Sequence, residues 1–260
     1  MDKEGLVKMN EDKLLKQWEK DEKAFFAGWD FSYIKKRMKG EKLPWDYRSM
    51  AKKLVKKSKS VLDMATGGGE VFSSFAPFPK HAIAIEGYKP NVAVARKKLA
   101  PLGVKVIFAN ETKKLPLKTG EFDLVLNKHG GINKESAKEI FRILSKGGVF
   151  LTQQVEGTNL DDLMRVFGAK PKWPSNTLEN LKKYLIKAGF KIKIAKKWSG
   201  KMTFKDVGAV VYFLKAIPWL VDNFSVKTYL PCLKKLQKKI DKDKKLAFSE
   251  KRFIILAEKK

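Results

Sequence analysis

Hydrophobic residues recur in this 260-residue chain as short runs separated by polar, helix-like segments. From residue 60 onward, the short runs have the length of buried strands, and the segments between them have apolar residues at helical spacing. Strands are predicted at 60–65, 81–86, 104–109, 122–127, 148–154, 190–197 and 252–258, and helices near 90–100, 133–145 and 176–188. Ser175 or Asn176 is expected to cap the last helix, and Gly189 to end it. This alternation is typical of an α/β domain with a mostly parallel sheet.

Two regions do not follow this alternation. Residues 1–59 are polar and helical in pattern, interrupted by aromatic clusters, and about fifty residues separate the last two predicted strands. An insertion of that length is too long for an idle loop in a compact domain, which favours a lid or a partner surface. We expect an N-terminal helical segment or lid (1–59), a core (60–198), a helical insertion that covers an acceptor (199–250) and a last core strand (251–260).

Composition favours a cytoplasmic enzyme. Hydrophobic residues make up 43% of the chain, enough for a core, and no apolar run approaches the ~18 residues of a membrane span. The first residues lack the apolar stretch of a signal peptide. Cys232 is the single cysteine, so no internal disulfide and no Cys-x-x-Cys zinc site is expected, and we predict no bound metal. A monomer without membrane contact is the default expectation.

The charge of the chain has two interpretations. Its 56 Lys and Arg against 28 Asp and Glu give a net charge of +28, which would favour a polyphosphate partner such as RNA. Only six of these cations are arginine, the residue preferred for bidentate phosphate contacts, so lysines that merely solvate helix faces explain the excess equally well. A lysine band without local acids is the candidate docking surface: Lys182, Lys183, Lys187, Lys191, Lys193, Lys196, Lys197 and Lys201.

Three consecutive glycines follow the first predicted strand, in Val61-Leu-Asp-Met-Ala-Thr-Gly-Gly-Gly-Glu70. Glycine lets a strand turn sharply into a helix while its backbone approaches a ligand, because no Cβ obstructs the approach. Several classes of nucleotide-binding protein use such a turn. The dinucleotide fingerprint Gly-x-Gly-x-x-Gly is incomplete here, and no Gly-Lys-Ser/Thr segment of a phosphate-binding loop is present, so these two classes are disfavoured.

The order of motifs resembles class I S-adenosylmethionine-dependent methyltransferases. Asp63-Met-Ala-Thr-Gly-Gly-Gly-Glu70 resembles the family's glycine loop, with Ala65 in place of its first glycine, and Ala84-Ile-Glu-Gly-Tyr resembles the second motif, whose acid is Glu86. Ala109-Asn-Glu-Thr, Leu115-Pro-Leu and Phe122-Asp-Leu-Val-Leu are similar to the third and fourth motifs, and Ile143-Leu-Ser-Lys-Gly-Gly-Val-Phe-Leu is similar to the fifth. The resemblance implies a Rossmann-like seven-stranded, mostly parallel sheet with helices on both faces.

The resemblance also implies a donor site for S-adenosylmethionine. Glu86 would accept the ribose hydroxyls, as an acid at the same place does in dinucleotide folds. Gly67 and Gly69 would let the backbone approach the donor, and Asp63 would hold the loop or meet the donor's amino group. Glu111, or alternatively Asn110, would contact adenine, with the Thr112 N–H as a further donor. The implied donor-binding set is Asp63, Ala65, Gly67, Gly69, Glu86, Gly87, Asn110, Glu111, Thr112 and Asn127.

The methyl acceptor is less defined. It is expected at the carboxyl ends of the fourth and fifth strands, where Asn127 and His129 are the catalytic candidates; His129 could be a general base or could merely close the donor pocket. The Asn/Asp-Pro-Pro-aromatic motif of adenine methyltransferases is absent, and Pro231-Cys232 lies far from the place of a cytosine-C5 nucleophile. Candidate substrate residues are Trp45, Tyr47, Gln153, Gln154, Asp206, Tyr212 and Trp219.

Three functions remain open at this point. The first is methyl transfer to an oxygen or nitrogen of a small molecule beneath an aromatic lid. The second is methylation of rRNA or tRNA docked on the lysine band. The third is donor binding without catalysis.

Overall fold

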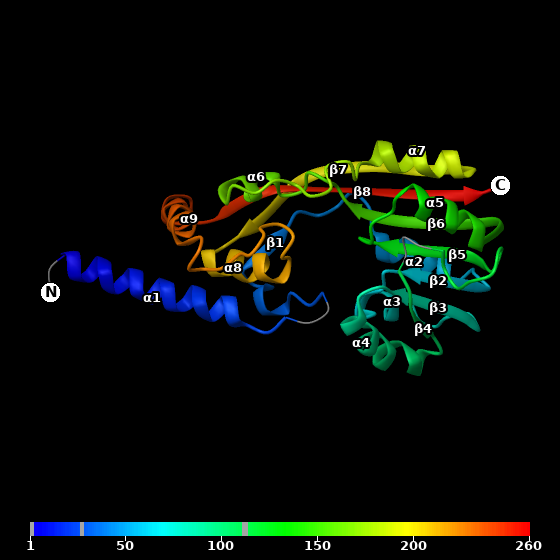
Figure 1. Ribbon diagram of the computed structural model, residues 1–260, viewed down its shortest axis with the longest axis horizontal. Helices are drawn as coiled ribbons and strands as arrows, with labels where there is room; N and C mark the ends of the chain where they lie inside the picture. The colour runs from blue at the N-terminus through cyan, green and yellow to red at the C-terminus, as the bar shows by residue number, and fades with distance from the viewer. Residues whose placement is uncertain (1–2, 27–28, 111–113) are drawn as a thin grey trace. The chain divides into compact units, whose positions relative to one another are not determined.

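The computed structural model describes residues 3–26, 29–110 and 114–260, with side chains from residue 11 onward. Figure 1 shows the arrangement of its elements. Its helices are α1 (Lys3–Lys23), η1 (Ser32–Ile34), α2 (Tyr47–Val55), α3 (Glu70–Ser73), α4 (Lys89–Leu99), η2 (Ala100–Leu102), α5 (Lys134–Ile143), α6 (Asp161–Val166), α7 (Leu178–Ala188), α8 (Val207–Ala216) and α9 (Leu230–Asp243). Its strands are β1 (Met38–Gly40), β2 (Ser60–Met64), β3 (His81–Glu86), β4 (Lys105–Phe108), β5 (Phe122–Lys128), β6 (Leu144–Val155), β7 (Phe190–Phe204) and β8 (Leu246–Lys259).

The described strands form one mixed sheet of eight strands in the order β1-β7-β8-β6-β5-β2-β3-β4. The pairs β2–β3, β2–β5, β3–β4 and β5–β6 are parallel, and β6–β8 and β1–β7 are antiparallel. The predicted α/β fold with a mostly parallel sheet is confirmed, but the predicted seven strands are one too few. The additional strand is β1, whose three residues are too few to show a strand period in the sequence.

The chain divides into two compact units. We call one the sheet unit; it comprises Leu43–Gly157, Pro174–Trp198 and Lys251–Lys260. The other, the helical unit, comprises Met1–Lys42, Thr158–Trp173 and Ser199–Glu250. The chain passes from one unit to the other within β7 and again within β8, and residues 43–59 belong to the sheet unit.

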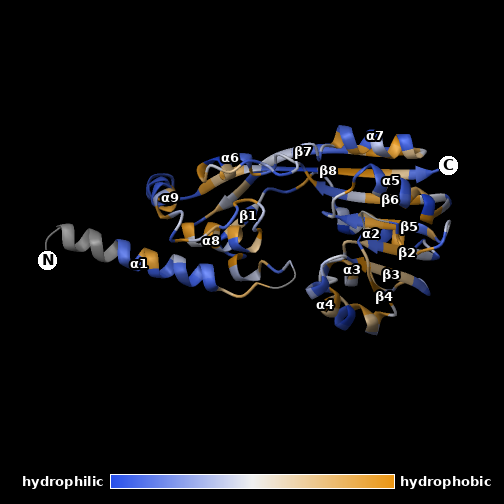
Figure 2. Cartoon of the chain, in the orientation of Figure 1, coloured by the Kyte–Doolittle hydropathy of each residue, from blue (hydrophilic) through white to orange (hydrophobic). Residues whose placement is uncertain are grey.

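The sheet unit buries apolar side chains on both faces of its parallel strands. In β2, Val61 packs in the layer that contains α2, α3 and α4, whereas its neighbour Leu62 packs in the layer that contains α5 and α7. Successive side chains of a strand point to opposite faces, so burial on both faces requires a continuous apolar run rather than an alternating one. Figure 2 shows hydrophobic residues along the central strands. Packing on both faces therefore holds the parallel strands, and with them their carboxyl ends, in place.

Two details of the predicted elements are corrected. The cap of α7 is neither Ser175 nor Asn176 but Thr177, whose Oγ1 accepts the Asn180 N–H at 3.2 Å. The Asn176 amide instead donates to the Val155 carbonyl at 2.7 Å. Gly189 ends α7 with a φ of 110°, as predicted.

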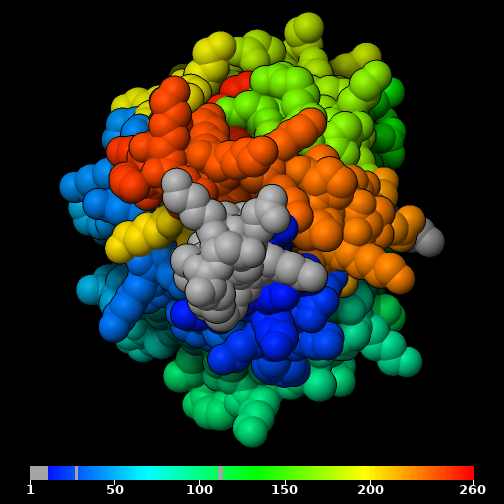
Figure 3. All heavy atoms as spheres, turned by 90° about the vertical axis from the view of Figure 1, so that its left-hand side faces the viewer, coloured from blue at the N-terminus to red at the C-terminus, as the bar shows by residue number. Residues whose placement is uncertain are grey.

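The helical unit is organised around α8. Nearly every residue of this helix is buried, and Trp18 of α1 packs in the same core. Figure 3 shows a face of this unit to which α9 contributes. Among the described residues, none of the helices combines the length and apolar character needed to span a membrane.

Candidate active site

The glycine loop after β2 has the geometry that its sequence predicts. Ala65, Gly67 and Gly69 are all in the left-handed region, with φ values of 56°, 63° and 80°. A non-glycine residue seldom adopts this conformation, so Ala65 is held there by its surroundings. A Cβ at Gly69 would lie 2.9 Å from the Leu99 side chain of α4, and therefore the loop requires glycine at this position.

Glu86 anchors this loop from the neighbouring strand. It ends β3 and is only 6% exposed. Its Oε2 accepts the Gly67 N–H at 2.7 Å, and its Oε1 accepts the Tyr88 N–H at 2.7 Å. Gly87, between Glu86 and Tyr88, is exposed beside the carboxylate.

Asp63 supplies a second buried carboxylate near the first. The pKa of Asp63 is raised to about 7, chiefly by burial and in part by the nearby Glu86 charge, while Thr66 and the Lys128 ammonium act in the opposite direction. The Tyr47 hydroxyl is also buried, makes no hydrogen bond within the described chain, and has a pKa raised by burial and by the Asp63 charge. A buried hydroxyl without a partner is costly, and paired buried carboxylates favour a cation. These groups fit a ligand that carries positive charge and polar donors.

Of the three residues expected to contact adenine, only Asn110 lies within the described part of the chain. Asn110 is exposed just beyond the end of β4, and Glu111 and Thr112 lie outside the described residues. Tyr88, two positions after Glu86, was not predicted as a site residue and is 63% exposed.

The polar groups of Asn127 and Gln154 bind within the protein. The fully buried Asn127 amide donates to the Met64 carbonyl at 3.3 Å, and its Oδ1 accepts from Gln154 Nε2 at 2.6 Å and from Thr152 Oγ1 at 3.1 Å. Gln154 also donates to the Gly130 carbonyl at 2.8 Å. These bonds tie the carboxyl ends of β2, β5 and β6 together. A direct contact of Asn127 or Gln154 with a ligand stays a prediction.

Three other predicted residues meet in one chain of hydrogen bonds. Trp45 Nε1 donates to Gln153 Oε1 at 2.8 Å, and Gln153 Nε2 lies 3.0 Å from His129 Nε2. His129 has a φ of 67°, and its N–H donates to the Gln153 carbonyl at 2.8 Å. Its side chain keeps solvent-accessible surface although Gln153 is almost fully buried. The imidazole therefore lies at the carboxyl ends of β5 and β6, where Gln153 holds both its ring and its backbone.

Two residues at this edge were missed from sequence. Lys128 is half-buried, and burial together with the charges of Arg48 and Arg252 lowers its pKa to about 8. A Cβ at Gly130 would lie 2.5 Å from both Ala65 Cβ and Asn127 Nδ2, so the loops after β2 and β5 can approach only with glycine there. In the segment Asn127-Lys-His-Gly-Gly131, only Asn127 and His129 are candidates from sequence.

The remaining substrate candidates lie in the helical unit. Asp206 caps α8 by accepting the Ala209 N–H at 2.8 Å and pairs with Arg37 at 2.6 Å. Tyr212 is buried, with its hydroxyl donating to the Phe25 carbonyl at 3.2 Å, and the 36% exposed Trp219 contacts the Trp29 ring at a centroid distance of 5.7 Å. The described contacts of Asp206 and Tyr212 thus stabilise this unit.

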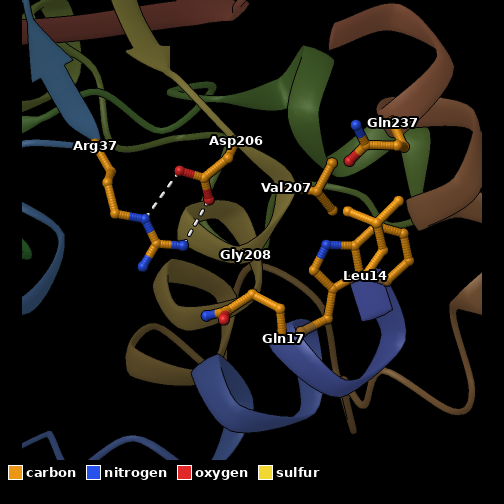
Figure 4. A pocket seen from close by; sticks show the side chains of 8 residues that line it. Leu14, Gln17, Arg37, Asp206, Val207, Gly208 and Gln237 are labelled. Carbon is orange, nitrogen blue, oxygen red and sulfur yellow. Dashed lines mark hydrogen bonds and ion pairs between the residues drawn. The ribbon is translucent and has the colours of Figure 1, made fainter. Parts of the chain in front are cut away.

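A pocket of about 450 Å³ also belongs to the helical unit. Figure 4 shows Arg37 and Asp206 pointing toward each other at its wall. The fully buried Asp21 carboxylate accepts from the same guanidinium at 2.9 Å, so this arginine is shared by two acids. None of the residues that line this pocket is a donor-site candidate. Within the described ranges, no cluster of His, Cys, Asp and Glu suits a metal ion.

The lysine band is not free of acids in space. Lys193 pairs with Glu258 at 2.7 Å, and Lys197 lies 3.6 Å from Glu179. Glu258 comes from β8, and Glu179 lies on α7, the helix that also carries Lys182 and Lys183. The description of the band as acid-free is therefore wrong for the folded protein.

The sheet order, the glycine loop after β2 and the acid that ends β3 are those of a Rossmann-like α/β domain. Comparison with known proteins agrees: the family described as "Methyltransferase domain" matches residues 62–152. A demethylmenaquinone methyltransferase of Thermus thermophilus is 31% identical over 117 residues, which are 42% of this chain and 53% of that protein. The chain thus spans about half the length of this relative.

Solved structures show the same fold. A protein of Bacillus halodurans described as a candidate methyltransferase superposes with a TM-score of 0.59 at 20% identity, covering 82% of this chain and 98% of the other. The YcgJ protein of Bacillus subtilis gives a TM-score of 0.57 at 17% identity, with coverages of 82% and 98%. Residues 62–152 are thus similar in sequence to the methyltransferase domain family, and the solved structures share the Rossmann-like fold.

Proposed function

We propose that this chain transfers a methyl group from S-adenosylmethionine to an oxygen or nitrogen of a small-molecule acceptor. The observation that carries the proposal is the position of Glu86, whose carboxylate supports the glycine loop at Gly67 from the end of the adjacent strand. This arrangement places a buried acceptor group and an open backbone together, as ribose recognition in nucleotide-binding folds requires.

The residues of the sheet unit fit the donor. Glu86 would accept the ribose hydroxyls, and the backbone at Gly67 and Gly69 would pass close to the donor. Asp63, with Tyr47 beside it, would meet the positively charged amino group, either directly or through water. When bound, S-adenosylmethionine supplies a methyl group on a sulfonium, which needs only an aligned nucleophile for transfer.

Two observations favour a small molecule as the methyl acceptor. His129, Gln153 and Trp45 form a connected set at the carboxyl ends of β5 and β6, and the Thermus relative is named for a small-molecule acceptor, demethylmenaquinone. Methyl transfer depends on in-line placement more than on covalent help from the protein, so a fixed edge of this kind suffices. The lysine band that suggested RNA is partly neutralised by Glu179 and Glu258.

The test is transfer of a tritiated methyl group from labelled donor into fractionated cell extract. RNA, protein and small-molecule pools are counted separately, with a Glu86→Gln variant as the background. Label in the small-molecule pool supports the proposal, and label in RNA replaces it with the RNA reading. Donor binding without label in any pool indicates a binding protein and contradicts methyl transfer.

A further inference from the structure

Three side chains, Trp45, Gln153 and His129, are joined by two hydrogen bonds whose donors and acceptors can be assigned from their chemistry. An indole Nε1–H is a donor and cannot accept, so the Gln153 atom that faces it at 2.8 Å must be the carbonyl oxygen Oε1. The other end of that amide is then the NH₂ group, which can only donate. This assignment does not depend on how the amide was oriented, because the reversed amide would bring two donors together.

The orientation of Gln153 determines the tautomer of His129. Gln153 Nε2 lies 3.0 Å from His129 Nε2, so this ring nitrogen must carry the lone pair that accepts the bond. The proton of the neutral ring is then on Nδ1. Protonation of Nε2 would again bring two donors together.

The charges around His129 act in the same direction. Desolvation by the groups packed around the ring, with the positive charges of Lys128 and Arg252, lowers the pKa of His129 below its usual value of 6.5, even though the residue keeps exposed surface. The two charges that contribute to this shift are both positive and therefore disfavour an imidazolium. Backbone geometry keeps the ring in place, because the His129 N–H bonds the carbonyl of the same Gln153.

We propose that Trp45 and Gln153 are positioning residues that keep His129 neutral with its proton on Nδ1, so that His129 donates a hydrogen bond to the acceptor rather than removing its proton. The inference rests on the proposed function and sharpens it in two ways. The general-base role, one of the two that the sequence left open for His129, is replaced by a donor role, because the basic nitrogen accepts from Gln153. The group of the acceptor that faces His129 must then itself accept a hydrogen bond, such as a carbonyl, phenolate or carboxylate oxygen.

Nuclear magnetic resonance of ¹⁵N-histidine-labelled protein tests this without any acceptor. The chain has two histidines, so His81→Asn identifies the His129 signals. We expect the Nδ1–H tautomer and a titration midpoint below about 6.5, the value of an ordinary imidazole. A protonated Nε2 in the wild-type protein at pH 7.5 would overturn the proposal.

Two variants change the direction of the bonds. In Gln153→Glu, a carboxylate accepts from both Trp45 and His129, so the His129 proton should move to Nε2 and its midpoint should rise by about one pH unit or more. In Trp45→Phe, the Gln153 amide can turn, so both tautomers should be populated. An unchanged Nδ1–H tautomer in both variants, with donor affinity retained as proof of folding, would contradict the inference. Calorimetric titration of S-adenosylmethionine separates the outcomes, since loss of donor binding in the wild type refutes the proposed function while leaving the tautomer result intact.

Discussion

Glu86 Oε2 and the Gly67 N–H are joined by a 2.7 Å hydrogen bond that links two neighbouring parallel strands at their carboxyl ends. The two residues are 19 positions apart in the sequence. Through this bond, a single carboxylate both shapes the glycine loop and faces the place where ribose is expected. Structure and ligand recognition therefore depend on the same side chain.

The first prediction concerns this bond. Glu86→Gln replaces an acceptor oxygen with an NH₂ group that faces a backbone donor, so we expect the dissociation constant of S-adenosylmethionine to rise about 10- to 100-fold, the effect of losing a hydrogen bond to a charged group. Isothermal titration calorimetry measures it. Glu41→Gln, at an exposed position of the helical unit, is the matched control and should bind as the wild type does. Equal affinity in the two variants would remove Glu86 from the donor site.

The second prediction concerns Asp63 and pH. Its pKa of about 7 means that the carboxylate is mostly neutral at pH 6 and mostly charged at pH 8. A cationic ligand prefers the charged form, so the dissociation constant of S-adenosylmethionine should fall about tenfold between these pH values. Asp63→Asn should bind the donor weakly and without this dependence. A wild-type affinity that is constant from pH 6 to pH 8 would contradict the role of Asp63.

The free energy of unfolding of the ligand-free protein should fall as pH rises, whereas donor affinity should increase. Because the folded-state pKa of Asp63 is raised, the folded protein holds its proton where the unfolded chain, with a pKa of about 3.9, has lost it. This contribution is complete below the unfolded pKa and is lost as pH rises through about 7. Asp63→Asn should therefore unfold at higher denaturant concentration than the wild type at pH 8, with the difference shrinking toward pH 5.

The third prediction uses two adjacent glycines. A Cβ at Gly130 would lie 2.5 Å from Ala65 and Asn127, whereas a Cβ at Gly131 would have no atom within 4 Å. Gly130→Ala should lower the free energy of unfolding by about 1–3 kcal/mol, the cost of overpacking, and Gly131→Ala should change it by less than about 0.5 kcal/mol. Urea unfolding followed by circular dichroism compares the two. Equal stability of both variants would show that the loops after β2 and β5 do not meet at Gly130.

The fourth prediction separates structure from substrate contact at Asp206. Asp206→Ala removes the α8 cap and one partner of Arg37, and should lower the free energy of unfolding by about 1–3 kcal/mol. Asp206→Asn keeps a capping oxygen and should lose less. Donor affinity should be unchanged in both, because Asp206 belongs to the helical unit. A stability equal to wild type in Asp206→Ala would return this residue to the list of free site candidates.

The sequence predicted much of the sheet because the parallel strands contain short apolar runs that are bounded by polar residues. It also predicted that Glu86 ends a buried strand, which the structure confirms. It could not predict that β7 and β8 continue well beyond their apolar segments, since the pairing of long strands is decided by their partners. The same limit applies to the acids that pair with Lys193 and Lys197 from other elements.

Side-chain direction was equally inaccessible from sequence. Asn127 was a site candidate by position, but its amide is used to join three strands. Trp45 and Gln153 were separate substrate candidates 108 residues apart, and only the fold shows that one orients the other. Asp206 illustrates the reverse case, since an aspartate before a helical apolar run is a cap signal that local reasoning could have used.

The most direct test of the account is calorimetric titration of S-adenosylmethionine into the purified wild-type protein at pH 8, beside Glu86→Gln. We predict one donor site per chain in the wild type and an affinity about 10- to 100-fold lower in the variant. A folded wild-type protein that shows neither binding heat nor thermal stabilisation by the donor would contradict the central claim.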